Sequence, residues 1–319
     1  MQSQAMRQLD RVIRAVAAKD VCVTLVGESG TGKEVLARRL HDLSRRRTGP
    51  FIPINCAAIP EALFESELFG HEKGAFTGAS ERARGKIEAS HQGTLFLDEI
   101  GEMPAGAQAK LLRFLENRRF MRVGGSEKIQ VDTRIICATL RPLDEEVRTG
   151  RFRADVYYRI QGVSLRVPPL RERRADIPPL VQYLVAQACS VHGTRPPKLG
   201  RSATAALRAY DWPGHVRELR NAVELVCLLR EGKAVRLRDL PPVIQSAAPV
   251  SAPAESSQTD PGDDEITLPL DMPLDEIVRR VLQAALRLEG GNRSRAARRL
   301  GVSLRTMQRH AARGPVTAH

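Results

Sequence analysis

The chain has 319 residues, of which 42% are hydrophobic and 27% are charged, and its formal net charge is +13. This length predicts a large and a small domain with cores of ordinary size, and the composition excludes a peptide, a fibrous chain and a chain that is disordered throughout. Because the sequence contains no run of about 20 apolar residues, and its first residues lack the apolar segment of a secretory signal, we expect a cytoplasmic protein with no membrane partner.

Charge is distributed unevenly along the chain. Residues 244–273 contain six acidic residues, no basic residue and five prolines, a composition typical of a flexible linker. Residues 274–319 contain ten arginines and three acidic residues, so this segment has a net charge of +7 and suits a polyanion such as double-stranded DNA. We therefore predict one large domain in two parts, residues 1–172 and 173–243, followed by the linker and a small basic domain.

Short runs rich in Val, Ile and Phe recur along the large domain, separated by segments with a helical pattern. We predict a strand at each run: residues 21–26, 51–54, 94–97, 134–138 and 162–167. Strands that alternate with helices favour a parallel sheet covered by helices, so the predicted fold class is α/β. After residue 178 only helices are predicted, over residues 180–191, 203–210 and 216–229, which indicates a helical sub-domain.

The first predicted strand leads into a glycine-rich loop with the pattern G-x-x-x-x-G-K, and a predicted helix over residues 35–43 follows. In this context glycines let backbone N–H groups converge on phosphate oxygens, the helix adds its positive N-terminal end, and Lys33 contacts the outer phosphates. The candidate nucleotide contacts are Gly27, Glu28, Ser29, Gly30, Thr31, Gly32, Lys33 and Glu34. Glu34 stands where Ser or Thr usually holds magnesium, so we expect the metal to depend on other residues. The alternative for the whole segment is a glycine-rich turn without a ligand.

Two adjacent carboxylates follow the predicted strand over residues 94–97. Because side chains alternate across a strand, Asp98 and Glu99 can have different roles. We expect Asp98 to hold Mg²⁺, directly or through water, and Glu99 to act as the general base that polarises the attacking water. Acidic residues often end strands at a surface, so the pair alone is weak evidence for catalysis. Together with the phosphate loop upstream it indicates a site of nucleotide hydrolysis.

The most specific motif is the hexapeptide Gly74-Ala75-Phe76-Thr77-Gly78-Ala79, which follows Glu-Leu-Phe-Gly-His-Glu at residues 67–72. With these motifs the chain resembles the AAA+ ATPases that activate bacterial transcription by the sigma-54 form of RNA polymerase, and the resemblance covers nearly the whole chain. In that family the hexapeptide forms the tip of a loop that contacts sigma-54. Two glycines flank an exposed aromatic ring and a hydroxyl group, which suits a flexible loop that changes conformation and binds a partner. A passive surface turn is the alternative.

The resemblance implies roles for further residues. Asn55 matches the residue that restrains the catalytic glutamate in the family, and a strand-end cap is an equally open interpretation. Arg153 and Arg159 match arginine fingers, which act on the nucleotide of a neighbouring subunit. On a helix these two lie about 9 Å apart along the axis, so one of them is alternatively a structural ion-pair partner. Arg217 matches a sensor that contacts nucleotide in its own subunit, the alternative being a solvated helix face.

Thr139 matches part of another nucleotide sensor, but Leu140 follows it where the family has Asn, so we expect altered coupling between hydrolysis and loop movement. The resemblance also implies ATP and Mg²⁺ as ligands, a ring that is hexameric when active and a dimer at rest, and sigma-54 RNA polymerase holoenzyme as a partner. Since no sensory domain is predicted before the ATPase, a regulatory protein acting in trans is a further expected partner.

The basic C-terminal segment is predicted to form a helix-turn-helix that resembles the Fis-type domain of the family. Residues 274–288 have helical hydrophobic spacing, Asn292 caps a second helix through residue 300, and a tight turn leads to a third helix from residue 303. The candidate DNA contacts are Arg293, Arg295, Ser303, Arg305, Thr306, Gln308 and Arg309. A basic solvated bundle without a DNA target is the alternative.

These features favour an ATP-hydrolysing transcriptional activator that binds DNA upstream of promoters and remodels sigma-54 holoenzyme so that the promoter opens. Leu140 and the short segment before the phosphate loop motivate a second hypothesis, a DNA-binding regulator with residual or no ATPase activity. A third hypothesis, an AAA+ remodeller of other proteins, is disfavoured by the hexapeptide.

Overall fold

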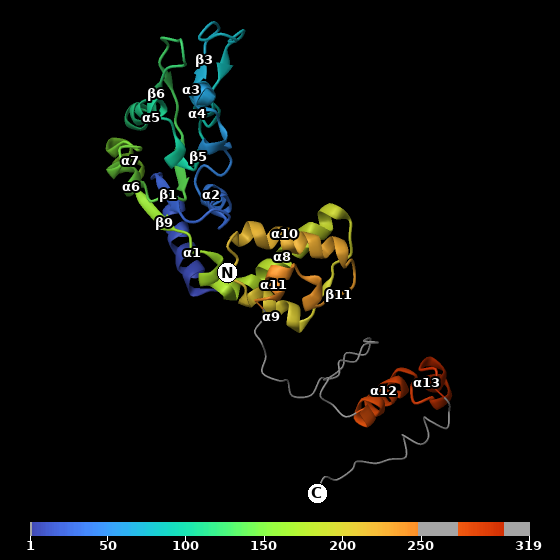
Figure 1. The fold of residues 1–319 in the computed structure, drawn as a ribbon. Helices are drawn as coiled ribbons and strands as arrows, with labels where there is room; N and C mark the ends of the chain where they lie inside the picture. The colour runs from blue at the N-terminus through green and yellow to red at the C-terminus, as the bar shows by residue number, and fades with distance from the viewer. Residues whose placement is uncertain (1, 248–273, 303–319) are drawn as a thin grey trace. The chain divides into compact units, whose positions relative to one another are not determined.

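The computed structural model describes residues 2–247 and 274–302 (Figure 1). The chain divides into two compact units, Met1–Val250 and Ser251–His319. No helix within the described ranges has both the length and the apolar character needed to cross a membrane.

A five-stranded parallel sheet forms the centre of the first unit, with the strand order β2-β5-β8-β1-β9. Its strands are β1 Val23–Val26, β2 Phe51–Asn55, β5 Thr94–Asp98, β8 Arg134–Thr139 and β9 Val163–Arg166. All five predicted strands are confirmed, and their ends differ from the prediction by two residues at most. Since β1 pairs with β8, the loop that follows β1 lies beside the end of β8.

Side chains of the sheet alternate between two apolar layers. Leu95 and Leu97 of β5 pack into one layer, and Phe96 between them packs into the other. Helices α1 and α2 cover the layer of Phe96, and α3, α4, α5, α6 and α7 cover the opposite one. The bounds are α1 Gln4–Ala17, α2 Lys33–Asp42, α3 Glu61–Phe69, α4 Lys86–Ala89, α5 Ala105–Asn117, α6 Leu143–Arg148 and α7 Ala154–Ile160, with 3-10 turns η1 Cys56–Ala58, η2 Ile100–Glu102 and η3 Leu170–Asp176.

Two short antiparallel hairpins extend from the same end of this unit (Figure 1). Their strands are β3 Gly70–His71, β4 Ala83–Arg84, β6 Arg119–Phe120 and β7 Ile129–Gln130. The loops of the hairpins touch, because His71 forms a β-bridge with Val123 and the N–H of Glu72 donates to the carbonyl of Val123 at 3.0 Å. The hexapeptide therefore lies in a loop that a second loop supports.

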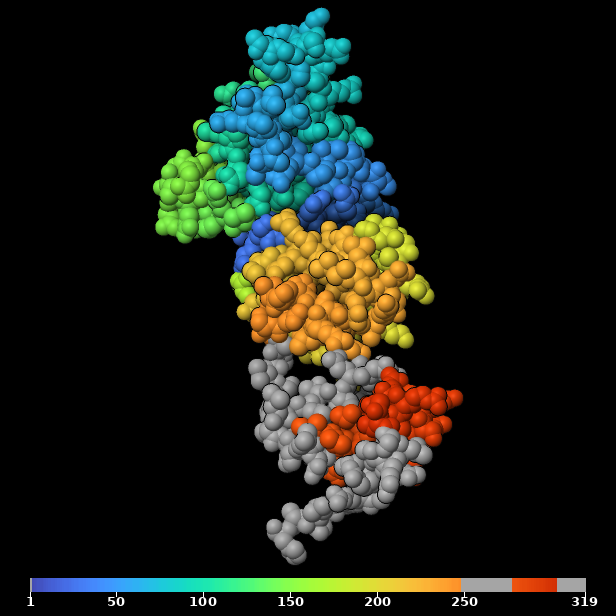
Figure 2. All heavy atoms as spheres, turned by 45° about the vertical axis from the view of Figure 1, so that its right-hand side comes forward, coloured from blue at the N-terminus to red at the C-terminus, as the bar shows by residue number. Residues whose placement is uncertain are grey.

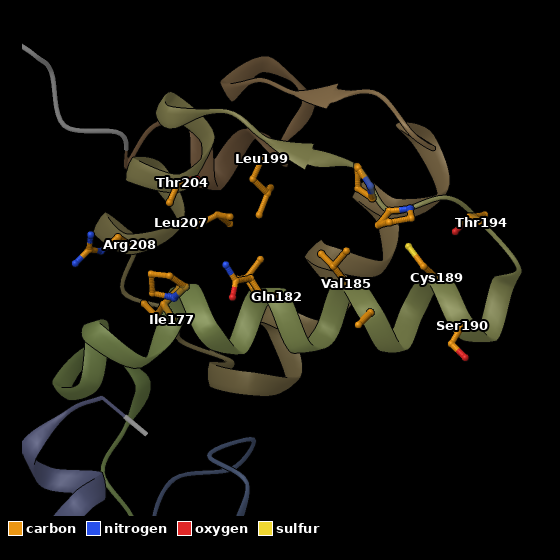
Figure 3. A pocket seen from close by; sticks show the side chains of 15 residues that line it. Ile177, Gln182, Val185, Cys189, Ser190, Thr194, Leu199, Thr204, Leu207 and Arg208 are labelled. Atoms are coloured by element: carbon orange, nitrogen blue, oxygen red, sulfur yellow. The ribbon is translucent and has the colours of Figure 1, made fainter.

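The residues after η3 form a helical part, shown in yellow and orange in Figure 2. Its elements are α8 Ile177–His192, α9 Arg201–Ala209, α10 His215–Leu229, η4 Leu237–Asp239 and α11 Pro242–Gln245. Trp212 is fully buried in its core and donates from its indole N–H to the carbonyl of Leu207 at 2.8 Å. A cavity of about 740 Å³ lies beside α8, with Val185, Leu199 and Leu207 in its lining (Figure 3).

Two predictions for this helical part are wrong. Helix α8 begins at Ile177 rather than near residue 180, because a proline in the first turn of a helix replaces an N–H group that would have no partner there. The part also contains two strands, β10 Lys198–Leu199 and β11 Ala234–Val235, which pair in parallel. Two residues are too few to show an alternating pattern, so periodicity does not reveal such strands.

In the second unit, α12 Leu274–Leu288 and α13 Arg293–Arg299 are the described helices. They pack through four buried side chains, Leu282, Ala285, Ala296 and Ala297. The Asn292 side chain accepts a hydrogen bond from the N–H of Arg295 at 3.1 Å, which confirms the predicted cap. The predicted third helix, from residue 303 onward, lies outside the described residues.

Candidate nucleotide-binding site

The carboxyl ends of four neighbouring strands bring the predicted site residues together. The phosphate loop follows β1, Asn55 ends β2, Asp98 ends β5 and Thr139 ends β8. Asn55 is paired in register with Asp98, and the N–H of Gly27 donates to the carbonyl of Thr139 at 3.1 Å. Parallel α/β sheets bind ligands at this edge, where loops and helix N-termini converge.

Lys33 is the buried centre of the phosphate loop. Its ammonium group donates to the carbonyl of Gly27 at 2.9 Å and lies 3.3 Å from Oε1 of Glu99. Gly32 precedes α2 with a φ of 96°, a conformation that favours glycine. A Cβ atom at Gly32 would meet nothing within 4 Å, whereas one at Gly27 would lie 2.9 Å from the carbonyl oxygen of Val167. The loop is therefore closed toward the protein and open at the helix N-terminus, which fits a row of phosphate groups.

Glu99 is held between the phosphate loop and the end of β8. Its φ is 51°, a left-handed conformation that is uncommon for residues other than glycine and is often found at functional sites. One carboxylate oxygen faces Lys33, and the other accepts a hydrogen bond from the backbone N–H of Leu140 at 3.0 Å. The main chain of residue 140 thus contacts the candidate general base, while its side chain has no hydrogen-bonding group. Altered coupling through Leu140 stays a prediction.

Asp98 is half-buried beside Glu99. Burial, and then the negative charge of Glu99, raise the pKa of Asp98, and the exposed Glu34 adds to this effect. A bound cation would offset this cost. In the described ranges no three His, Cys, Asp or Glu side chains form a group able to hold a metal. Proteins usually bind Mg²⁺ through one or two carboxylates together with the phosphates of a substrate, and a metal role of Asp98 stays a prediction.

The first turn of α10 contacts the phosphate loop. The N–H of Val216 donates to the carbonyl of Gly30 at 3.0 Å, and Nη1 of Arg217 donates to Oγ of Ser29 at 3.0 Å. Gly30 has a φ of 80°, and a Cβ atom there would lie 2.5 Å from the carbonyl oxygen of Gly214. Arg217 therefore reaches the loop of its own chain, and its role toward a nucleotide stays a prediction.

Three residues that the sequence interpretation missed also contact the loop. His215 is fully buried with Nε2 2.9 Å from Oε2 of Glu28, and Arg171 bonds the other oxygen of Glu28 at 2.6 Å. The buried Arg173 donates to the carbonyl of Thr31 at 2.6 Å. In the sequence these three residues belong to the strings Leu-Arg-Glu-Arg (residues 170–173) and Trp-Pro-Gly-His (residues 212–215). Neither string reveals a contact with a loop so far upstream.

The ion pairs of Glu28 give this contact a pH dependence. Hydrogen bonds from Arg171, and to a smaller extent from His215, lower the pKa of Glu28 from 4.5 to about 2. A carboxylate with a lowered pKa stabilises the folded state above its ordinary pKa and loses that contribution as the pH falls toward the folded value. We expect Glu28→Gln to melt below the wild type at neutral pH, and the difference to shrink between pH 4.5 and about 2. The effect is small because Glu28 is 52% exposed. Calorimetry across this window measures it, and a constant difference contradicts the assignment.

Asn55 performs the capping role that the sequence left open. Its side chain accepts a hydrogen bond from the N–H of Ala57 at 3.0 Å, at the start of η1. Asn55 lies in register with Asp98 at the same edge of the sheet, and its restraining role toward Glu99 stays a prediction.

The two candidate arginine fingers lie on or next to α7. Arg153 precedes the helix and forms an ion pair with Asp155 at 2.7 Å, whereas Arg159 lies in its last turn and donates to the carbonyl of Leu115 at 3.2 Å. Within the described part of the chain, neither contacts the phosphate loop. Arg153 therefore fits the structural ion-pair alternative, and action on a second subunit stays a prediction for both.

The hexapeptide forms a closed tip. The N–H of Gly74 donates to the carbonyl of Ala79 at 2.9 Å, and the two glycines, Gly74 and Gly78, have φ values of 81° and 106°. Ala79 is buried, whereas Phe76 is 39% exposed and Thr77 is exposed. The tip thus presents an aromatic ring and a hydroxyl group to solvent.

In the second unit, Arg293 and Arg295 are exposed on α13. The other candidate DNA contacts lie outside the described residues: Ser303, Arg305, Thr306, Gln308 and Arg309.

Three family models match successive parts of the chain: a sigma-54 interaction domain over residues 1–166, an AAA+ ATPase lid domain over residues 171–257, and a bacterial regulatory protein domain of the Fis family over residues 273–310. The chain belongs to the sigma-54 activator family. It is 45% identical to the transcriptional regulatory protein ZraR of Klebsiella oxytoca over 305 residues, and this alignment covers 96% of this chain and 66% of that protein. It is 41% identical to the DNA-binding transcriptional regulator NtrC of Azospirillum brasilense over 324 residues, and this alignment covers 96% of this chain and 67% of that protein.

Among solved structures, this sigma-54 activator is similar to NtrX from Brucella abortus in complex with ATP. The TM-score is 0.73 at 37% sequence identity, and the match covers 97% of this chain and 67% of NtrX. The chain thus spans about two thirds of the length of these relatives. The predicted fold class, a parallel α/β sheet followed by a helix-turn-helix domain, is confirmed.

Proposed function

We propose that this sigma-54 activator hydrolyses ATP and uses the energy to remodel sigma-54 RNA polymerase holoenzyme, while its C-terminal unit binds double-stranded DNA upstream of the promoter. The observation that supports this most is the position of Glu99 between Lys33 and the backbone of residue 140, at the edge where the phosphate loop begins. A carboxylate held in this way can orient and polarise a water molecule for attack on a terminal phosphate.

The other residues of the edge have distinct roles in this proposal. Lys33 and the backbone N–H groups of the loop bind the outer phosphates, and Arg217 contacts the nucleotide from the same chain. Asp98 would hold Mg²⁺, which neutralises charge on the phosphates when it is bound. Thr139 connects the end of β8 to the loop through its carbonyl oxygen.

The arginine that stabilises the developing negative charge comes from a second copy of the chain. Arg159 lies near the amino end of β1, whereas the phosphate loop follows the carboxyl end of that strand, so Arg159 does not serve the site of its own chain. We therefore infer a hexameric ring as the active form and a dimer at rest. A regulatory protein acting in trans and a cytoplasmic location belong to the same proposal.

The alternative of a DNA-binding regulator without ATPase activity arises from Leu140. A backbone N–H group, which every residue except proline provides, contacts Glu99 from this position. The replacement of the usual Asn by Leu therefore leaves the bond to the general base in place, and this favours hydrolysis.

Thr77→Ala tests the role of the hexapeptide. We expect promoter opening by sigma-54 holoenzyme to be lost while ATP hydrolysis continues near the wild-type rate, because Thr77 is exposed on a tip that is remote from the phosphate loop. Ser80→Ala is the matched control, since it removes a hydroxyl group just outside the hexapeptide and should leave opening unchanged. Open complexes are measured by permanganate reactivity of the melted DNA. Full opening by Thr77→Ala would show that the loop assignment is wrong.

A further inference from the structure

The cavity in the helical part lies on the side of α8 that faces α9 and β10 (Figure 3). Its volume of about 740 Å³ is within the range of sites that hold small organic molecules. Among the described residues, neither the phosphate loop, residues 27–34, nor the first turn of α10, residues 215–217, contributes to its lining. The cavity is therefore distinct from the candidate nucleotide-binding site.

The middle of the cavity is apolar. Val181 and Val185 are about one turn apart on α8, so they share the face that lines it. Across the cavity from Val185 lie Leu199 of β10 and Leu207 of α9 (Figure 3). The apolar part of a ligand placed between these side chains is removed from water, which is the main source of affinity in such sites.

One end of the cavity has a hydroxyl group without a partner. The Oγ1 atom of Thr194 is buried and forms no hydrogen bond with any described residue. The backbone of Thr194 is fixed, because its N–H donates to the carbonyl of Cys189 at 3.1 Å. Buried polar groups of folded proteins are nearly always hydrogen-bonded, and an unpaired one is costly. The hydroxyl group of Thr194 therefore indicates a polar partner that the protein itself does not supply.

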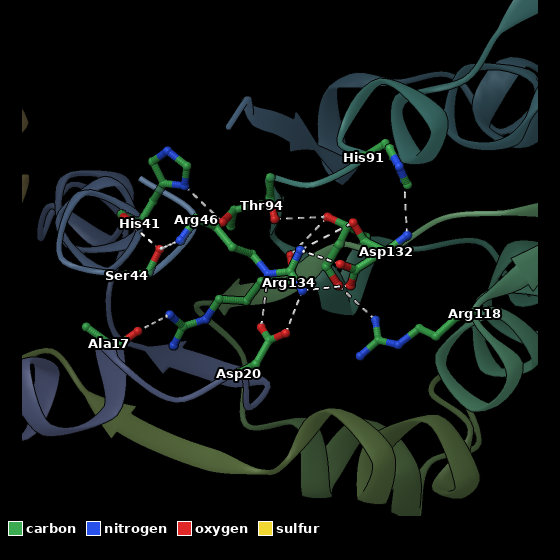
Figure 4. Close-up of polar contacts among 12 residues, drawn as sticks. Ala17, Asp20, His41, Ser44, Arg46, His91, Thr94, Arg118, Asp132 and Arg134 are labelled. Atoms are coloured by element: carbon green, nitrogen blue, oxygen red, sulfur yellow. Dashed lines mark hydrogen bonds and ion pairs between the residues drawn. The ribbon is translucent and has the colours of Figure 1, made fainter. Parts of the chain in front are cut away.

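Toward the other end, the lining includes two polar side chains, Gln182 of α8 and Arg208 of α9 (Figure 3). Both are exposed, and within the described ranges the Gln182 amide forms no hydrogen bond and Arg208 no ion pair. Arg208 thus differs from arginines whose charge is compensated within the fold, such as Arg46, which bonds both Asp20 and Asp132 at 2.6 Å (Figure 4). A guanidinium and an amide group together can donate several N–H bonds to a carboxylate.

The charge and the length of the cavity restrict the ligand further. Among the described residues that line it, Arg208 is the one with a charge, so the lining favours an anion over a cation. Arg208 lies at the end of Ile177, and Thr194 lies at the end of Cys189 (Figure 3). About 18 Å of helix separate Ile177 from Cys189, so a ligand that reaches both polar ends must be elongated.

We propose that the cavity between α8 and α9 binds an elongated monocarboxylate with an apolar body, a class that includes the medium-chain fatty acids. The carboxylate binds Arg208 and Gln182, and the apolar body fills the middle of the cavity. A second polar group at the far end of the ligand binds the hydroxyl group of Thr194. The inference concerns binding alone and does not rest on ATP hydrolysis.

The first test measures binding of decanoate to the full chain by calorimetry, below the concentration at which decanoate forms micelles. We expect decanoate to bind, and Arg208→Gln to weaken its binding about threefold or more. Decanol has the same apolar body without the charge, so Arg208→Gln should leave its weaker binding unchanged. Arg201→Gln is the matched control, because Arg201 is exposed on the same helix but does not line the cavity.

The second test examines the end of the cavity at Thr194. The probe is ω-hydroxydecanoate, which carries a hydroxyl group at the end opposite its carboxylate. We expect it to bind about twofold to tenfold more tightly than decanoate, and Thr194→Val to abolish this difference while binding of decanoate itself persists. Because Thr194→Val removes an unpaired hydroxyl group at nearly constant size, we expect the variant to fold as the wild type does.

The titrations are repeated at two concentrations of the chain, since a second copy seated in the cavity would make the affinity for decanoate fall as the chain is concentrated. An affinity that is independent of the chain concentration, lowered by Arg208→Gln and unchanged by Arg201→Gln, supports the proposal. The proposal is overturned if decanoate does not bind, if the two arginine variants bind it equally well, or if the affinity depends on the concentration of the chain.

Discussion

Replacement of Lys33 by alanine is expected to reduce ATP hydrolysis by at least about 100-fold and to weaken ATP binding. The ammonium group of Lys33 is buried, and it lies within 3.3 Å of Glu99 and 2.9 Å of the carbonyl of Gly27. Its removal takes away the positive charge for the outer phosphates and leaves the carboxylate of Glu99 without its counter-charge. Release of inorganic phosphate at saturating ATP measures the rate, and a fluorescent nucleotide measures binding.

Lys110→Ala is the matched control for this variant. Lys110 lies on α5 and forms an exposed ion pair with Glu65, so its loss removes one lysine of equal size far from the phosphate loop. We expect its hydrolysis rate to stay within about twofold of the wild type, since exposed ion pairs contribute little. If Lys33→Ala and Lys110→Ala hydrolysed ATP equally fast, residues 27–34 would not be the catalytic phosphate loop.

Glu99→Gln is expected to separate binding from hydrolysis. The amide has the size of the carboxylate but cannot accept a proton, so we expect hydrolysis to fall by about 100- to 10,000-fold while ATP binding persists. The backbone strain at Glu99, with a φ of 51°, is unchanged by this substitution. The expected result is a chain that holds ATP and turns it over very slowly.

Glu102→Gln provides the comparison for Glu99→Gln. Glu102 lies in η2, three residues further along the chain, and forms an ion pair with Arg141 at 2.7 Å. We expect this variant to hydrolyse ATP near the wild-type rate. A decrease in Glu102→Gln equal to that in Glu99→Gln would mean that the carboxylate at residue 99 is not the general base.

Local patterns predicted the strands of the sheet and the position of the phosphate loop. The strands are short apolar runs, the phosphate loop follows the first of them and Asp98 ends another, so residue types and spacing predicted Lys33 and Asp98, whereas Thr139 came from the family resemblance. Two features of the helical part were beyond such patterns. Strands β10 and β11 have two residues each, and the start of α8 depends on prolines that are tolerated only in a first turn.

The contacts that η3 and the helical part make with the phosphate loop show a second limit of sequence patterns. His215 and Arg171 reach Glu28 across 187 and 143 residues of sequence, and no periodicity relates residues so far apart. Leu140 shows a third limit. Its side chain cannot form a hydrogen bond with phosphate or water, and the effect of this on coupling stays a prediction. The contact with Glu99 comes from the main chain, which the identity of the residue does not report.

Promoter opening with purified components tests whether ATP hydrolysis by this chain drives the remodelling of sigma-54 holoenzyme. The chain, sigma-54 holoenzyme and promoter DNA are combined with ATP or with a non-hydrolysable analogue, and melted DNA is measured by permanganate reactivity. We expect opening with ATP, none with the analogue, and loss of opening in Glu99→Gln in proportion to its loss of hydrolysis. Equal opening with ATP and with the analogue, or rapid hydrolysis without any opening, would contradict the proposed function.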